Sequence, residues 1–427
     1  MTPILNRETK QGVYLSLFSG TNIVAAFFFQ WYLLSKLGAG IETDAFFASF
    51  TIPQFVIAMV GSSLMHVLVP ILSTRPRERI DQDAWIAFWF IGLIFGLIAF
   101  ILIISANLWV PLLFPGFKGH EAHLTVTLSR IQLAGMILSA VNAVQWAAYH
   151  SKQKFIWAEC VPMSASIAVL PMLVWALPRF GVIAGAWLTL LKLILQTLFL
   201  LPGMGRPRPP RISSYVLREM RRRIAPLLVG TAYYKTDPLV ERALLSTALS
   251  GSLSLYYFAQ QIYGAVCQVL NKAIAAPLVP KMSNFHVRKE TSSIRKVYYK
   301  KLFIVFLLGT GCLLTVSLLG PRLLGLLTLL GKFTANDITR LYWILICLGG
   351  MLIGGLLGQI ASVSFYACGD TKTPTKLSMV TYTLYIPCKV FAFLKSGVLG
   401  LATVTSLYYL LNFFLQFHFF RRKYLHE

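Results

Sequence analysis

The chain has 427 residues, of which 56% are hydrophobic and only 13% are charged, against about 25% charged in a typical soluble domain. So few polar residues cannot cover a water-facing surface, which excludes an ordinary soluble protein and indicates that lipid surrounds most of the chain. The net charge of +24 would suggest nucleic acid in a soluble protein, but basic residues accumulate in the cytoplasmic loops of membrane proteins, so no nucleic-acid partner is predicted.

Apolar segments long enough to cross a bilayer recur along the whole chain. A transmembrane helix needs about 20 consecutive, mostly apolar residues. The polar residues 1–11 lead into an apolar run that is too long for the core of a cleaved signal peptide, so this run is expected to be a retained helix. In chain order, the sequence predicts about twelve transmembrane helices, at 13–37, 44–72, 84–109, 124–149, 155–177, 179–202, 224–247, 253–280, 297–319, 337–367, 375–395 and 397–420.

Basic residues divide unequally between the two sets of loops that these helices create. If the N-terminus is cytoplasmic, the loops on that side carry 26 Lys and Arg residues and the periplasmic loops carry six. Because lysine and arginine are retained on the cytoplasmic side, both ends of the chain are predicted to be cytoplasmic. The chain is therefore expected to be an all-α, multi-pass protein of a bacterial inner membrane.

The largest predicted cytoplasmic loop, 203–223, is rich in proline and arginine and falls at the middle of the chain. We interpret it as a solvated basic linker that could also contact anionic lipid headgroups. It divides the chain into an N-terminal lobe at 1–202 and a C-terminal lobe at 224–427, each with six predicted helices.

The two halves resemble each other in sequence at an offset of 210 to about 218 residues. Val69-Pro70 ends the second predicted helix and Val279-Pro280 ends the eighth, while Gly181 begins the sixth and Gly397 begins the twelfth. Because each half has an even number of helices, the repeats run parallel. Two parallel lobes are typical of alternating-access transporters, which bind their substrate between the repeats.

Three parts of the chain carry a distinctive residue pattern. They are Gly38–Pro53, with Thr43-Asp44-Ala45-Phe46-Phe47 at its centre, the pair Val240–Ser246 and Gly251–Ser254, and Phe365–Pro374. Together they resemble the MurJ/MviN family of lipid II flippases, in the MOP superfamily that also holds O-antigen flippases and MATE drug exporters. The resemblance implies a V-shaped, two-lobe helical bundle. It also implies a polyprenyl-diphosphate-linked saccharide as substrate, moved from the cytoplasmic to the periplasmic leaflet.

The chain departs from the family pattern in helix number and in charge. The family usually has fourteen helices, and its charged residues in the first, second and eighth helices fall here at Phe29-Gln30, Ile57-Ala58 and Gln260-Gln261. In the family, arginines at these places are the presumed diphosphate-binding cations. The resemblance therefore leaves the saccharide open between lipid II and a related exopolysaccharide or O-antigen precursor.

Ionisable residues inside the predicted spans are the candidate substrate-binding residues, because a charge at mid-membrane costs about 2.5–3.5 kcal/mol and is rarely kept without a use. Lys235, Asp237 and Glu241 lie on the seventh helix, Lys272 on the eighth and Arg130 on the fourth. The cations are predicted to bind the diphosphate in a central cavity, where a low dielectric strengthens their attraction. The carboxylates are predicted to hold those cations or a coupling ion. The alternative is that these residues, with Arg242, form structural pairs.

Prolines, glycines and aspartates in or beside the spans suggest further roles. Pro238, inside the seventh span, is predicted to kink that helix and to act in gating. The glycines between Gly349 and Gly358 predict close helix packing. Asp44 and Asp370 lie at helix ends that are expected to face water, where they would cap helices and organise loops.

No catalytic site is predicted, because the longest periplasmic loop, about 320–336, holds no acid–base or nucleophile set. The six cysteines lie in apolar stretches without metal-ligand spacing, so no metal or other cofactor is expected, and a coupling ion is left unidentified. The predicted function is a flippase that acts as a monomer on a lipid-linked saccharide, with membrane lipid as its surroundings. The alternative is an ion-coupled, MATE-type exporter of small molecules, which would depend on Asp237 or Glu241.

Overall fold

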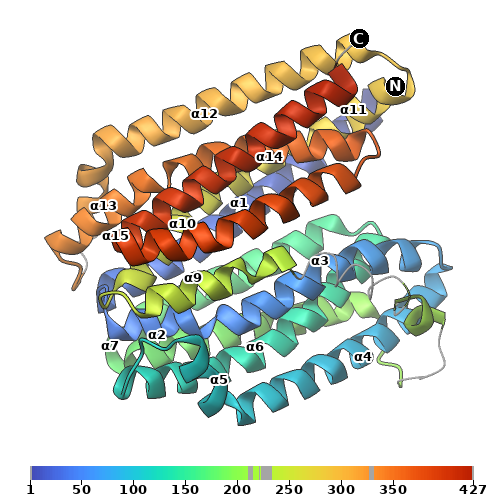
Figure 1. The fold of residues 1–427 in the computed structure, drawn as a ribbon. Coiled ribbons are helices and arrows are strands. Elements are labelled where there is room, and N and C mark those ends of the chain that lie inside the picture. The colour runs from blue at the N-terminus through green and yellow to red at the C-terminus, as the bar shows by residue number, and fades with distance from the viewer. Residues whose placement is uncertain (1, 210–214, 221, 223–232, 327–330, 426–427) are drawn as a thin grey trace. The chain divides into compact units, whose positions relative to one another are not determined.

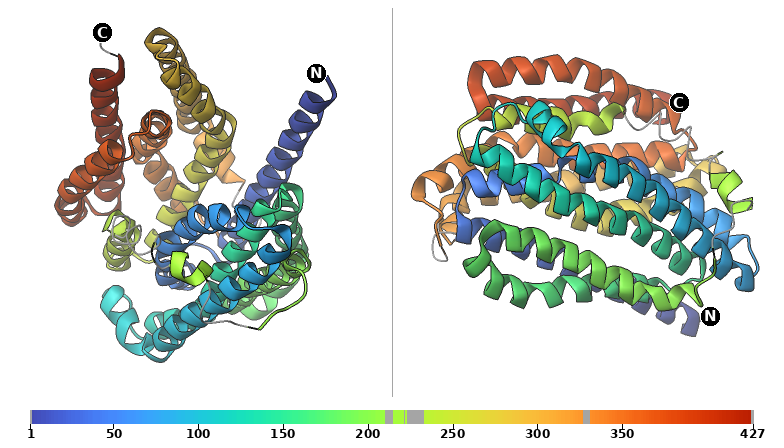
Figure 2. Two further views of the ribbon diagram at one scale, coloured as in Figure 1. Left: turned by 90° about the vertical axis from the view of Figure 1, so that its right-hand side faces the viewer. Right: turned by 90° about the horizontal axis from the view of Figure 1, so that it is seen from below.

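A computed structural model describes residues 2–209, 215–220, 222, 233–326 and 331–425. These residues form helices and turns with no strand, as Figure 1 and the two further views in Figure 2 show. The chain divides into two compact units, Met1–Leu253 and Ser254–Glu427. The predicted all-α fold is confirmed.

The first unit is organised around one central helix, α6 (His120–Ser151), which packs against five other helices. Its buried face is rich in alanine and other small residues, so neighbouring helices approach it closely. The helices of this unit are α1 (Thr2–Leu37), α2 (Ile41–Ser49), α3 (Thr51–Ser73), α4 (Arg77–Ile104), α5 (Ala106–Leu113), α6, α7 (Phe155–Leu200), the 3₁₀ turns η1 (Leu201–Met204) and η2 (Tyr233–Thr236), and α9 (Asp237–Ser246).

The second unit has α14 (Gly349–Ala367) in the corresponding central place, packed against α11, α12 and α15. Glycine lets it approach α15 closely, since a Cβ atom added at Gly354 would lie only 2.6 Å from the backbone carbon of Tyr409. The predicted close packing of this glycine run is confirmed. The elements of this unit are α10 (Ser252–Leu270), the π-helical η3 (Asn271–Ala275), α11 (Ala276–Val287), α12 (Thr291–Gly325), α13 (Ala335–Cys347), α14, α15 (Lys372–Phe420) and the π-helical η5 (Arg421–Leu425).

Eight helices of the described residues are long and apolar enough to cross a membrane. They account for ten predicted spans, because α7 and α15 each contain two spans joined at a kink. Of the other two spans, 44–72 is divided into α2 and α3 at Phe50, and only the part of 224–247 from Tyr233 onward lies among the described residues.

The internal repeat is visible in backbone geometry. Both kinks lie at a glycine with a positive φ, Gly181 (φ 61°, ψ −153°) and Gly397 (φ 60°, ψ −142°), a conformation open mainly to glycine. The turn before each kinked helix also repeats. The Lys154 N–H donates to the Tyr149 carbonyl and the Asp370 N–H donates to the Phe365 carbonyl, both at 3.0 Å. Each pair of matching residues is 216 apart in number, within the offset that the sequence predicted.

The segment predicted to be a solvated linker is partly packed in the first unit. Val216 and Met220 are buried in the hydrophobic cluster that also contains Trp85 of α4. The Arg75 guanidinium lies 4.3 Å from the centre of the Tyr215 ring. For residues 215–220 the expected solvated loop was wrong, because the apolar residues at 216, 217 and 220 form one helical face.

Candidate functional site

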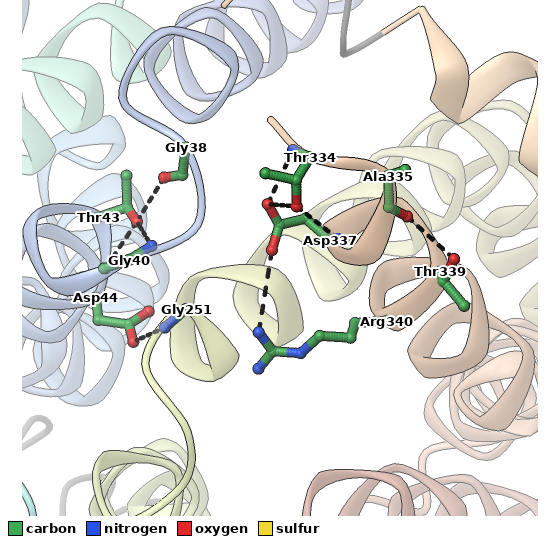
Figure 3. A network of polar contacts seen from close by, with 10 residues as sticks. All are labelled: Gly38, Gly40, Thr43, Asp44, Gly251, Thr334, Ala335, Asp337, Thr339 and Arg340. Carbon is green, nitrogen blue, oxygen red and sulfur yellow. Dashed lines mark hydrogen bonds and ion pairs between the residues drawn. The ribbon is translucent and has the colours of Figure 1, made fainter. Parts of the chain in front are cut away.

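The candidate residues of the seventh predicted span lie on η2 and α9, which belong to the first compact unit, whereas the sequence placed them in the C-terminal lobe. Three contacts attach this region to that unit. The first is made by Arg242. In the second, the Gly251 N–H donates to Asp44 Oδ2 at 2.6 Å (Figure 3). In the third, the Gly116 N–H donates to Ser246 Oγ at 3.3 Å.

Arg242 joins α9 to the junction between α2 and α3. Its Nη1 donates to the Phe47 carbonyl at 3.2 Å and to Thr51 Oγ1 at 2.9 Å, and its Nη2 donates to Gln54 Oε1 at 2.7 Å. The side chain is only 6% exposed. Because Phe47 lies in the last turn of α2, the guanidinium also complements the negative end of that helix. Arg242 therefore holds α9 against the junction of α2 and α3, through partners that the sequence did not suggest.

Thr43 and Asp44 organise the start of α2. Thr43 Oγ1 accepts from the Gly40 N–H and donates to the Gly38 carbonyl, both at 3.0 Å (Figure 3). Asp44 is 2% exposed and fixes the turn at Gly251. The predicted role of Asp44 as a loop organiser is confirmed, but the prediction that it faces water was wrong, because the carboxylate is buried against the turn that it holds.

Lys235, Asp237 and Glu241 follow one another along η2 and α9. Lys235 lies in the 3₁₀ turn and is half-buried, Asp237 is in the first turn of α9, and Glu241 is 3% exposed one helical turn further on. A carboxylate in the first turn of a helix is stabilised by the positive end of the helix dipole. The structure thus places a cation and two carboxylates within two helical turns.

Pro238 lies in the first turn of α9, after the 3₁₀ turn, rather than in the interior of a continuous helix. A proline at this position removes no intrahelical hydrogen bond, because the first N–H groups of a helix have no partner within it. The predicted proline kink is thus replaced by a junction between two helix types at residues 236–237.

Arg130 and Lys272 lie in different surroundings. Arg130, exposed on α6, donates from Nε to the Ile103 carbonyl at 3.3 Å and from Nη2 to Asn107 Oδ1 at 3.4 Å, so it caps the C-terminal end of α4. Lys272 is exposed on the π-helical η3 of the second unit. Single-turn π-helical segments are frequent at functional sites, which keeps Lys272 a candidate.

The sequence did not single out Lys389, the most deeply buried lysine of the second unit. It is 0% exposed on α15, and its Nζ lies 5.0 Å from the centre of the Tyr385 ring, a cation–π distance. The hydroxyls of Tyr385 and Tyr256 each share a hydrogen bond with Thr405, at 2.8 and 3.1 Å. The available signal was a lysine near the middle of the 375–395 span, where an ionisable residue indicates function by default.

Asp370 and Asp337 hold helix starts in the second unit. Asp370 accepts from the Thr373 N–H at 3.0 Å and from Lys423 Nζ at 2.7 Å. Burial opposes the charge of Asp370, yet the hydrogen bonds from Lys423 and Thr373 hold the pKa of its carboxyl well below its usual range. Asp337 forms a capping box with Thr334 and lies 4.0 Å from the Arg340 guanidinium (Figure 3). The predicted loop-organising role of Asp370 is confirmed.

Within the described ranges, no group of three or more His, Cys, Asp or Glu side chains has the geometry of a metal site. Gln30, which stands where the family has a charged pair, has a buried Oε1 with no hydrogen-bond partner among the same residues. The candidate residues are therefore cations, carboxylates and uncharged polar groups distributed over the two units.

A duplicated set of long apolar helices that carries a few buried ionisable residues defines a multi-pass membrane protein of the transporter class. The chain belongs to the MurJ family, because the sequence profile described as "Lipid II flippase MurJ" matches residues 33–426. The predicted family, and with it a multi-pass inner-membrane location, is confirmed.

Curated relatives match this chain in sequence along most of their own length. The lipid II flippase MurJ of Burkholderia cenocepacia is 23% identical over 80% of this chain and 70% of the relative. The probable lipid II flippase MurJ of Vibrio cholerae is 21% identical over 96% of this chain and 82% of the relative.

Solved structures show the same fold. The lipid II flippase MurJ in an inward closed conformation matches with a TM-score of 0.84 and 18% identity, over 96% of this chain and 87% of that one. An inward-facing MATE multidrug transporter of the MOP superfamily matches with a TM-score of 0.79 and 16% identity, over 96% and 97%. The predicted MOP fold is confirmed, and the likeness to MATE transporters extends to the fold alone.

Proposed function

We propose that this protein is a flippase that moves lipid II, or a polyprenyl-diphosphate saccharide of the same class, from the cytoplasmic to the periplasmic leaflet by alternating access. The observation that carries the proposal is the family match over residues 33–426. A MATE transporter shares the fold almost as well, but fold alone does not identify a substrate. The protein acts as a transporter rather than an enzyme, as a monomer and without a cofactor.

In this proposal, Lys235 and Lys272 supply the positive charge for the diphosphate. Both lie on short non-α segments, η2 and η3, and neither side chain is fully buried by the protein. An ammonium group near a low-dielectric wall attracts a phosphate more strongly than it does in bulk water. Asp237 and Glu241 hold these cations in place or bind a coupling ion. Arg130 is the weakest candidate, since its guanidinium already binds the Ile103 carbonyl.

Lys389 adds a second kind of candidate. Its complete burial beside Tyr385 makes it unable to contact substrate in the structure described here. We assign it a positioning role in which its charge stabilises one packing of α15. The rearrangement of the 3₁₀–α junction at Pro238 would change the direction of α9 during transport.

Complementation tests the function. A cell depleted of its own lipid II flippase should grow when it expresses this chain, and should fail to grow with Lys235→Ala or Lys272→Ala. Lys281→Ala is the matched control for Lys272→Ala, since Lys281 is also exposed and lies nine residues further on, in α11, which directly follows η3. Lys389→Met should also fail, while exposed Lys395→Met should support growth.

The alternatives predict different outcomes. If the wild-type chain is present in the membrane but does not restore growth, and its deletion abolishes another surface polysaccharide, the substrate is a different lipid-linked saccharide. If Asp237→Asn or Glu241→Gln abolishes drug efflux but leaves growth unchanged, the protein is a MATE-type exporter. If neither lysine substitution has an effect on a rescuing protein, the assignment of the diphosphate-binding cations is wrong.

A further inference from the structure

A cationic cavity lies at the start of α12, and none of the candidate substrate residues is among the described residues that line it. Its volume is about 390 Å³, and its walls are made by Thr291, Ser292, Arg295, Lys296 and Tyr299 of α12 with Leu425 of η5. Such a volume lies within the range of small-ligand sites in proteins, roughly 300–1,000 Å³. All of these residues belong to the second unit, so the cavity is complete within one compact part of the chain.

Within the described part of the chain, no carboxylate forms an ion pair with either cation of the cavity, Arg295 or Lys296, and both side chains are exposed. By contrast, Lys423 on the adjacent η5 is paired with Asp370 at 2.7 Å. Two unpaired cations beside two hydroxyl groups and a tyrosine form a donor-rich site, which favours a phosphate oxygen over a neutral or cationic ligand.

The wall of the cavity continues into an apolar surface. Arg295, Tyr299 and Phe303 are spaced four residues apart, so they lie on one face of α12. Phe303 is 62% exposed, and Phe306 and Leu307, on the next turn, are 45% and 53% exposed. The ligand that fits both parts has a phosphate at one end and hydrocarbon chains at the other.

The depth of the cavity agrees with such a ligand. The apolar part of α12 begins at Leu302, six residues after Lys296, which is about 9 Å along a helix. Headgroup layers extend roughly 5–8 Å beyond the hydrocarbon core, and lysine and arginine side chains reach several ångströms back toward it. Arg295 and Lys296 can therefore contact the phosphates of the cytoplasmic leaflet.

We propose that this cavity, formed by the first turns of α12 and by η5, binds the phosphodiester headgroup of an anionic phospholipid of the cytoplasmic leaflet, with its acyl chains along Phe303 and Leu307. The residues that line this cavity differ from the candidate substrate residues, and its occupancy does not depend on the flippase activity proposed above.

Lipid titration of the purified full-length protein in detergent, followed by native mass spectrometry, tests the site. Phosphatidylglycerol should bind in preference to phosphatidylcholine. Arg295→Gln with Lys296→Gln should weaken phosphatidylglycerol binding about 30-fold, since each basic residue near a lipid headgroup contributes about 1 kcal/mol. The matched control is Lys300→Gln with Lys301→Gln, which removes the same charge from the next turn, outside the cavity. It should change binding less than about 3-fold.

Shape and ligand source are tested separately. Ser292→Trp fills the cavity without changing its charge and should also abolish the preference for phosphatidylglycerol. Equal losses in both double variants would mean diffuse surface attraction and overturn the proposal. Displacement of phosphatidylglycerol by millimolar inorganic phosphate would mean a site for soluble anions, and binding of undecaprenyl diphosphate with exclusion of phosphatidylglycerol would mean a substrate site. Either result overturns the assignment of the cavity to an anionic phospholipid. The lipid-binding measurements are independent of the complementation test, so the two proposals can fail separately.

Discussion

Replacing Arg242 with methionine tests how α9 is attached to the first unit. Methionine keeps most of the apolar stem of arginine but removes the three hydrogen bonds to Phe47, Thr51 and Gln54. Gln54 is exposed, so water replaces that bond at small cost. The Phe47 carbonyl and the Thr51 hydroxyl are buried, so both lose a charged donor that water cannot easily replace.

The magnitude follows from those two buried acceptors. A hydrogen bond to a charged group contributes about 1.5–3 kcal/mol. Because the retained methionine stem limits cavity formation, we take the lower value for each acceptor and expect a loss of about 3 kcal/mol in the free energy of unfolding. For a unit of roughly 250 residues, about 2–4 °C per kcal/mol gives a fall of about 6–12 °C in melting temperature.

The assay is intrinsic-fluorescence melting of the purified protein in detergent. Arg218→Met, which removes an exposed arginine from the 215–220 segment, is the control and should shift the melting temperature by less than about 2 °C. In a double-mutant cycle with Thr51→Val, the coupling to Arg242→Met should be about 1 kcal/mol or more. A shift for Arg242→Met no larger than that of the control would refute the structural role of Arg242.

Three further predictions concern backbone packing and charge. Gly354→Ala should destabilise the protein by about 1–3 kcal/mol, because its Cβ would overlap the α15 backbone, whereas Gly358→Ala has ordinary contacts and should melt near the wild-type temperature. Gly397→Ala should cost about 1–3 kcal/mol at its positive φ. Gly311→Ala, at an open helical position, should be neutral or stabilising in the same melting experiment. Asp370→Asn should lower the melting temperature at pH 7. Because the folded pKa of Asp370 is depressed, this contribution is present above the unfolded value of about 4 and is lost as the pH falls further, so melting curves of wild type and variant should converge only in strong acid.

Hydropathy in the sequence predicted the helices well, because a bilayer requires about 20 apolar residues for each crossing. The family was predicted from residue patterns such as Gly38–Pro53 and Phe365–Pro374. The repeat could also be read from sequence, since Gly181 and Gly397 are needed for the same backbone conformation. Close packing at Gly354 was similarly predictable, because small residues let helices approach.

Side-chain roles were harder to predict. Sequence spacing could not show that Arg242 reaches across to Thr51, which is 191 residues away in the chain. Pro238 inside an apolar span suggested a kink, but in the structure a new helix begins there. Lys389 was not among the predicted site residues, although its position in an apolar span carried the signal.

The turn before each kinked helix occurs twice, and its two copies differ in local stability. Both copies need one residue in the left-handed region, and the second copy uses Gly369 (φ 76°) where the first uses Gln153 (φ 60°). Glycine adopts this region freely, whereas another L-residue loses about 1 kcal/mol or more. The two halves share one architecture but differ in local stability, so amide hydrogens around Gln153 should exchange with solvent sooner than those around Gly369. The two turns therefore share a backbone shape but differ in the free energy needed to open them.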